Sequence, residues 1–229
     1  MRKNSLPIGL SSRWIPITIL IMTVICLAGC GSKEAEKSAP GALVMDQVAY
    51  EAWEIALVEM RIEKNEQFSA PESSPLPVAE IAGFDGLNYY FPKAELRFRT
   101  PFIAEAGTDT VSLTKRKGNV VPYIRRGKVQ FSYGGGQHTL PVFGPVDTSN
   151  GNYLWLPYSD LTTGKETYGG GRYLDITLDT EGMVDLDFNY SYNPLCDYNP
   201  EKYNCTLPPA ESKLDFAVEA GEMSFHTTH

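Results

Sequence analysis

The chain has 229 residues, of which 42% are hydrophobic and 11% aromatic, so it is long and apolar enough to bury a substantial core. Acidic residues outnumber basic ones by 28 to 20, and the formal net charge is -8. This balance argues against a nucleic-acid partner and against attachment to an anionic membrane through surface charge alone.

Residues 1–29 are typical of a bacterial lipoprotein signal peptide. They contain three basic residues and no acidic one, and an apolar run at 15–27 is too short to span a bilayer of roughly 30 Å. The run ends in Leu-Ala-Gly followed by Cys30, which resembles the lipobox at which a cysteine is acylated and the signal is cut. An ordinary secretory signal or an uncleaved anchor is the alternative.

The lipobox resemblance implies that acylated Cys30 holds the mature protein on a lipid bilayer. Two or three acyl chains, palmitate among them, suffice for stable anchoring where one is marginal. Gly31 stands where Asp would favour retention in the inner membrane, so we expect the outer membrane of a bacterial cell envelope. Residues 30–42 are polar and lack apolar periodicity, which predicts a flexible tether.

The spacing of apolar residues predicts a helix over Leu43–Lys64. The residues that fall three or four apart, and that we expect to face the core, are Met45, Ala49, Ala52, Trp53, Ala56 and Met60.

From Leu96 onward the pattern changes to short β-type runs separated by glycine turns. The expected strands are Leu96–Phe102, Thr110–Thr114, Val120–Ile124, Lys128–Ser132, Thr139–Phe143, Tyr153–Tyr158, Glu166–Tyr168, Tyr173–Leu178, Met183–Asn189 and Leu214–Ala220. Short strands without intervening helices predict a mainly β fold, an antiparallel β-sandwich or barrel-like sheet with one N-terminal α-helix. We assign 43–223 to a single globular domain and 224–229 to a disordered tail.

The C-terminal third carries a series of short motifs. They are ETYGGGRYLD at 166–175, LDFN at 186–189, YNPLC at 192–196, YNC at 203–205, LPP at 207–209 and EAGE at 219–222. Upstream, FDGLNYYFP at 84–92 belongs to the same set. Together the motifs resemble the bacterial domain-of-unknown-function-1684 (DUF1684) family, here as a lipoprotein member. Gly170 and the pair Ser212-Lys213 depart from the family pattern. The resemblance implies a common domain but assigns no activity.

Cys196 and Cys205 bracket eight residues rich in turn formers. Outside the cytoplasm a disulfide is the expected state of such a pair. Reduced structural thiols, and a metal or redox role, are the alternatives.

The most informative stretch is 173–189, where apolar and polar residues alternate on both sides of a turn. A three-residue loop at 180–182, with Gly182 in the left-handed conformation, places every apolar residue on one face and sets Asp175 directly opposite Asp187. Like charges across a strand pair are destabilising. Either the face is solvated, or Arg172 pairs with the acids, or a cation such as Ca²⁺ lies between them with Asp185 and Asn189 as added ligands, or the pair shares a proton.

These features favour a non-catalytic module that binds a small ligand or an envelope protein, with no cofactor, no metal and no catalytic residue. The candidate ligand-binding residues are Arg172, Tyr173, Asp175, Asp187, Asn189 and Glu211. The alternative is a small hydrolase-like envelope enzyme with a polar site around Arg172, Asp187, Asn189 and Glu211.

Overall fold

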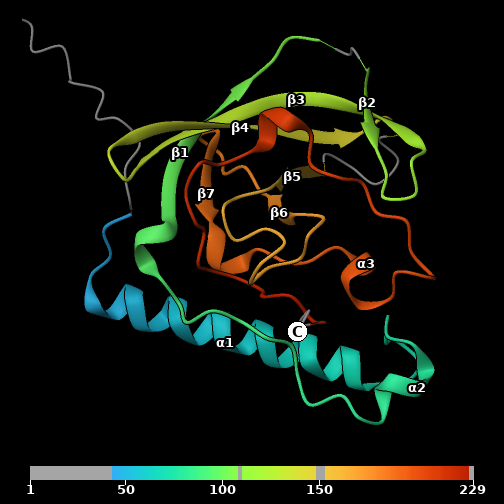
Figure 1. Ribbon diagram of the computed structural model, residues 1–229. Helices are drawn as coiled ribbons and strands as arrows, with labels where there is room; N and C mark the ends of the chain where they lie inside the picture. The colour runs from blue at the N-terminus through green and yellow to red at the C-terminus, as the bar shows by residue number, and fades with distance from the viewer. Residues whose placement is uncertain (1–42, 108–109, 148–152, 227–229) are drawn as a thin grey trace, which may run out of the picture. The chain divides into compact units, whose positions relative to one another are not determined.

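The computed structural model describes residues 43–107, 110–147 and 153–226. The predicted signal peptide, the lipidation site Cys30 and the tether lie outside the described residues. In the described part, seven antiparallel strands form a curled half-barrel sheet, and one long helix, α1 (Gln47–Ser69), accompanies it (Figure 1). The prediction of a mainly β fold with one N-terminal helix is confirmed. None of the described helices is long and apolar enough to cross a membrane.

The strands are β1 (Arg97–Ala104), β2 (Thr110–Thr114), β3 (Val120–Tyr133), β4 (Gly136–Pro145), β5 (Leu154–Tyr158), β6 (Arg172–Ile176) and β7 (Met183–Asp187). The short helices are α2 (Val78–Ile81), α3 (Leu195–Tyr198) and three 3-10 turns, η1 (Ala94–Leu96), η2 (Phe188–Tyr190) and η3 (Ala210–Ser212). The sheet order is β6-β5-β4-β3-β1-β7, and β2 pairs with β3 outside this path. The two strands of the 173–189 stretch therefore stand at opposite ends of the sheet order.

Helix α1 begins later in the chain than predicted because Asp46 caps it, and it continues beyond the predicted end to Ser69. The Asp46 carboxylate accepts a hydrogen bond from the Ala49 N–H at 2.8 Å, which satisfies one of the free donors of the first turn. The helix buries Trp53, Leu57 and Phe68, whereas the alanines of the predicted stripe are exposed. Large side chains rather than alanines thus define its packing face.

Strand β3 is one continuous strand where two were predicted. A bulge between Arg125 and Gly127 shifts the register with β4 without ending the strand. A Cβ atom at Gly127 would collide with the Ile103 carbonyl oxygen of β1. Glycine is therefore required by the close approach of two strands, and not by a turn.

Two predicted strands, Glu166–Tyr168 and Leu214–Ala220, are not strands. In the second, the carbonyl oxygens of Val218 and Ala220 accept hydrogen bonds from the Arg172 guanidinium. The apolar pattern of this segment reflects burial of an irregular chain whose carbonyls have a side-chain donor. The prediction of a disordered tail is also wrong for its first residues, since the Phe225 N–H donates to Asp197 Oδ2 at 2.8 Å.

Strand β5 is buried on both faces and so separates two apolar clusters. Leu154, Leu156 and Tyr158 point into the main core, whereas Trp155 points the opposite way, as alternation along a strand requires. The second cluster contains the buried residues Leu113, Phe143, Trp155 and Tyr173. One face of the sheet thus holds the core, and the other carries an aromatic surface.

Candidate functional site

The predicted turn of the 173–189 stretch is correct, but the predicted pairing of its aspartates is wrong. Leu178 pairs with Val184, and Gly182 has a φ of 74°. Beyond this turn the two strands separate: Asp175 pairs with Trp155 of β5, and Asp187 pairs with Arg97 of β1. The proposed cation or shared proton between the two acids therefore has no geometric basis.

Asp187 is buried in a network that joins α1, β1 and β7. Its Oδ2 accepts a hydrogen bond from Trp53 Nε1 at 2.7 Å and lies 2.8 Å from Arg97 Nε, while Oδ1 accepts from the backbone N–H and Nδ2 of Asn189. Burial raises the pKa of Asp187, and the hydrogen bonds and the Arg97 charge oppose that rise. Asn189 also bonds both backbone groups of Lys93. This network fastens the helix to the sheet.

Asp175 is exposed and is held by two phenols. Tyr153 and Tyr192 each donate a hydroxyl hydrogen bond to its Oδ1 at 2.7 Å. Burial raises the pKa of both phenols, and the neighbouring Asp175 carboxylate raises it further. Both tyrosines therefore remain protonated donors at neutral pH.

The remaining predicted residues of the enzyme alternative lie in separate networks. Arg172 is buried and its Nη2 lies 2.7 Å from the buried Asp160 carboxylate. Glu211 pairs with Arg125 at 2.8 Å. Asp187 and Asn189 lie in one network. Among the described residues, neither of them shares a hydrogen-bond or ion-pair partner with Arg172 or Glu211.

Cys196 and Cys205 form a disulfide with a Cα–Cα distance of 5.9 Å. The bridge closes the loop that contains α3. Short backbone bonds fasten the end of this loop to the β2–β3 hairpin, since the Arg116 N–H donates to Cys205 O and the Leu207 N–H donates to Thr114 O. The disulfide thus ties the two ends of the loop together, and the hairpin holds the Cys205 end in place.

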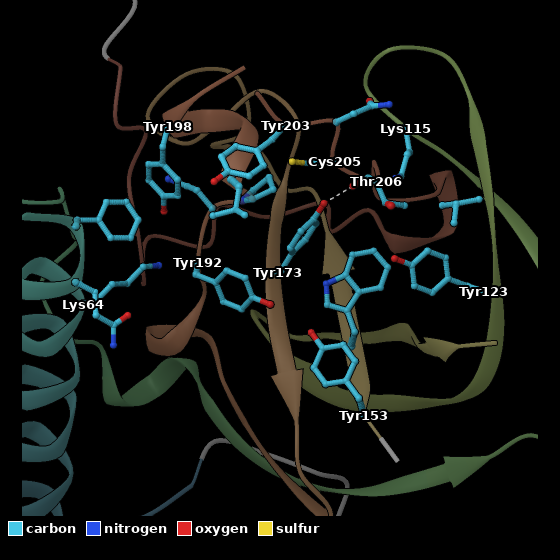
Figure 2. A pocket seen from close by; sticks show the side chains of 18 residues that line it. Lys64, Lys115, Tyr123, Tyr153, Tyr173, Tyr192, Tyr198, Tyr203, Cys205 and Thr206 are labelled. Atoms are coloured by element: carbon cyan, nitrogen blue, oxygen red, sulfur yellow. Dashed lines mark hydrogen bonds between the residues drawn. The ribbon is translucent and has the colours of Figure 1, made fainter. Parts of the chain in front are cut away.

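This loop forms one wall of an open cleft with a volume of about 610 Å³ (Figure 2). The opposite wall is the aromatic face of β3, β5 and β6, where Trp155 packs between the rings of Tyr123 and Tyr173. The end of α1 closes one side with Lys64, Gln67 and Phe68. Six tyrosines line the cleft: Tyr123, Tyr153, Tyr173, Tyr192, Tyr198 and Tyr203.

The charge of the cleft is opposite to that of the chain. Its 18 lining residues include Lys64 and Lys115 and no Asp or Glu. The two lysines lie on opposite sides of the cleft (Figure 2). Lys64 forms an ion pair with the buried Glu222, and it also separates this cleft from an adjoining cavity of about 360 Å³ that reaches Asp175.

Of the residues in this region, the sequence predicted only Tyr173, the disulfide cysteines and the neighbouring Asp175. The other lining residues come from segments that are distant in the chain and share no motif. The chain has 13 tyrosines, and several of them alternate with core residues on the strands. This was the signal in the sequence that could have indicated the cleft. A tyrosine on the solvent side of a strand is a weak signal by itself, and only the fold shows that these residues meet.

The fold and the cleft define a class of protein: a curled antiparallel half-barrel with an N-terminal helix and an aromatic cleft closed by a disulfide loop. The chain belongs to the family described as "Protein of unknown function (DUF1684)", whose model matches residues 82–223. It is also similar to an uncharacterized protein of Haloarcula marismortui whose solution NMR structure is known. The two share 34% identity over 78% of this chain and 97% of that one, with a TM-score of 0.59. No curated protein matches the sequence.

Proposed function

We propose that this protein is a non-catalytic ligand-binding module and that the aromatic cleft is its binding site. The observation that carries the proposal is the cleft itself, which has the size of small-molecule sites and the predominantly hydrophobic and aromatic lining they use. Its wall is fixed by the Cys196–Cys205 disulfide, so the site is largely formed before the ligand arrives. A preformed site avoids the entropic cost of ordering a loop on binding.

The test is a thermal-shift screen of the purified chain with sugars, nucleotides, metals and aromatic acids, repeated with a variant whose cleft is filled. Leu195 lines the cleft and is 43% exposed, so Leu195→Trp adds bulk there without removing a core contact. Leu161 is 48% exposed and does not line the cleft, which makes Leu161→Trp the matched control. A ligand that binds the native state raises the unfolding midpoint.

We expect at least one compound to raise the midpoint of the parent and of Leu161→Trp but not that of Leu195→Trp. A compound that stabilises both tryptophan variants equally binds elsewhere and contradicts the assignment of the cleft.

We further propose that the module is anchored through acylated Cys30 to the bacterial envelope, on the outer membrane, as the lipobox-like Leu-Ala-Gly-Cys sequence indicates. Cys30→Ser is expected to abolish acylation and to block signal cleavage. Intact-mass analysis of the protein from its native host checks this, and an unmodified mature Cys30 would contradict it.

A further inference from the structure

The cleft contains two cations but only one is available to a ligand. The Lys64 ammonium pairs with Glu222, which is buried and also accepts hydrogen bonds from the Tyr198 hydroxyl and the Asn193 backbone N–H. Lys115, in contrast, makes no ion pair among the described residues, although it lies half-buried on the other side of the cleft (Figure 2). A cation beside aromatic walls and partly shielded from bulk water is a favourable partner for an anion.

Asn193 is a buried structural residue of the cleft wall and is 2% exposed. Its Nδ2 donates to Asp197 Oδ2 at 2.8 Å and to the Met223 carbonyl at 2.7 Å, and these two acceptors fix the orientation of the amide. Its Oδ1 is buried and has no hydrogen-bond partner among the described residues. The protein encloses this oxygen, so a ligand in the cleft does not reach it, and Asn193 serves to hold the cleft wall in position.

The body of the ligand must suit the rings that line the cleft. Tyr123, Tyr192 and Tyr203 are only partly buried and line the space. Their ring faces favour a flat ring or the C–H face of a sugar.

We infer that the cleft takes a cyclic acid, whose carboxylate pairs with Lys115 and whose ring lies against the tyrosines. The inference rests on the cleft being the binding site, as proposed above. A sugar acid and a hydroxylated aromatic acid share this chemistry, and the experiment separates the two sources.

Calorimetric titration of the full chain with glucuronate and with 4-hydroxybenzoate tests the inference, with glucose and phenol as the partners that lack the carboxylate. Lys115→Gln removes the proposed anion partner, and Lys165→Gln removes the same charge from an exposed position outside the cleft. We expect one acid to bind at least about tenfold more tightly than its neutral partner, the difference expected for one charge-assisted contact. Lys115→Gln should abolish that difference, and Lys165→Gln should retain it.

Which acid binds identifies the source as saccharide or aromatic. Failure of both acids to bind overturns the inference, as does binding that Lys115→Gln leaves unchanged. Neutral rings that bind as tightly as the acids also overturn it but leave the proposed ligand-binding function standing. The Leu195→Trp screen judges that function independently, because it makes no assumption about ligand charge.

Discussion

Asp187 and Asp175 lie in two regions of the molecule that accommodate a carboxylate in different ways. At the junction of α1 with the sheet, Asp187 is buried and receives donors from Trp53, Asn189 and Arg97. At the rim of the cleft, Asp175 is exposed and receives only the hydroxyls of two tyrosines. Water can replace lost hydrogen-bond partners at the rim but not in the interior. An aspartate therefore contributes very differently to stability in the two places.

Two other aspartates are also buried, and they extend the comparison. Asp160 is buried together with the cation that neutralises it, Arg172. Asp197 is buried with hydrogen-bond donors but with no lysine or arginine within ion-pair distance in the described part of the chain. Burial raises the pKa of Asp197 to about 6, because the surrounding donors only partly replace water.

The largest effect is expected from Arg172→Met. It leaves Asp160 as an uncompensated buried charge and removes the donors of the Val218 and Ala220 carbonyls. Breaking a buried pair in this way costs about 3–5 kcal/mol of unfolding free energy. Urea unfolding measures it, with Arg125→Met as the control, since the Arg125–Glu211 pair is exposed to solvent and contributes at most about 1 kcal/mol. Equal losses of unfolding free energy in the two variants would contradict the expected difference between the buried pair and the exposed pair.

Asp197→Asn should stabilise the protein at neutral pH. The asparagine can accept through its oxygen from Asn193 and Phe225 and donate to the Ser224 hydroxyl, so only the buried charge is lost. The folded pKa of Asp197, about 6, exceeds the unfolded value of 3.8, so the contribution of its protonated carboxyl to stability is fully present below the unfolded pKa and is lost as pH rises through 6. The variant should therefore be within about 1 kcal/mol of the parent at pH 4 and exceed it by up to about 3 kcal/mol at pH 7.

Urea unfolding of the parent and Asp197→Asn across this pH range checks the prediction. Because other titrating groups are common to both proteins, the difference between them isolates Asp197. A difference that stays constant from pH 4 to pH 7 would show that the carboxylate is not held with a raised pKa.

Asp187→Asn should destabilise the protein by about 1–3 kcal/mol, the scale for a buried hydrogen-bond partner left unsatisfied. The aspartate accepts on both oxygens, and an amide can accept on only one of them. In the variant, the amide NH₂ group must then face the N–H donors of either Trp53 or Asn189, and two donors cannot form a hydrogen bond. Chemical denaturation at pH 7 gives the loss, and an unchanged midpoint would mean that the network is not part of the helix–sheet junction.

The smallest effect is expected from Asp175→Asn, at less than about 1 kcal/mol. Both phenols bond the same oxygen, Oδ1, and an amide oxygen can accept both bonds. The site is exposed, so water satisfies what remains. If Asp175→Asn costs as much as Asp187→Asn under the same conditions, the distinction between the two regions does not hold.

Local patterns predicted the features that neighbouring residues control. Alternation along 173–189 and the glycine at 182 predicted the turn and the Leu178–Val184 pair correctly. The disulfide of Cys196 and Cys205, expected for a cysteine pair outside the cytoplasm that brackets turn-forming residues, is also present. A helix near 43–64 also followed from spacing, but its packing face was only partly predicted: Trp53 is buried as expected, whereas the alanines that satisfy the same period are exposed.

The sequence by itself determined the mainly β class, the N-terminal helix, the turns and most strand positions, because backbone sterics and local hydrophobic periodicity set these. Only the tertiary structure decided that Asp175 faces β5 while Asp187 faces β1, since strands that leave one turn are free to pair with different neighbours. It also decided that Lys64, Lys115, Trp155 and Asn193 share one cleft. Such long-range contacts depend on how the sheet curls and where the helix packs, and no local pattern in the chain encodes them.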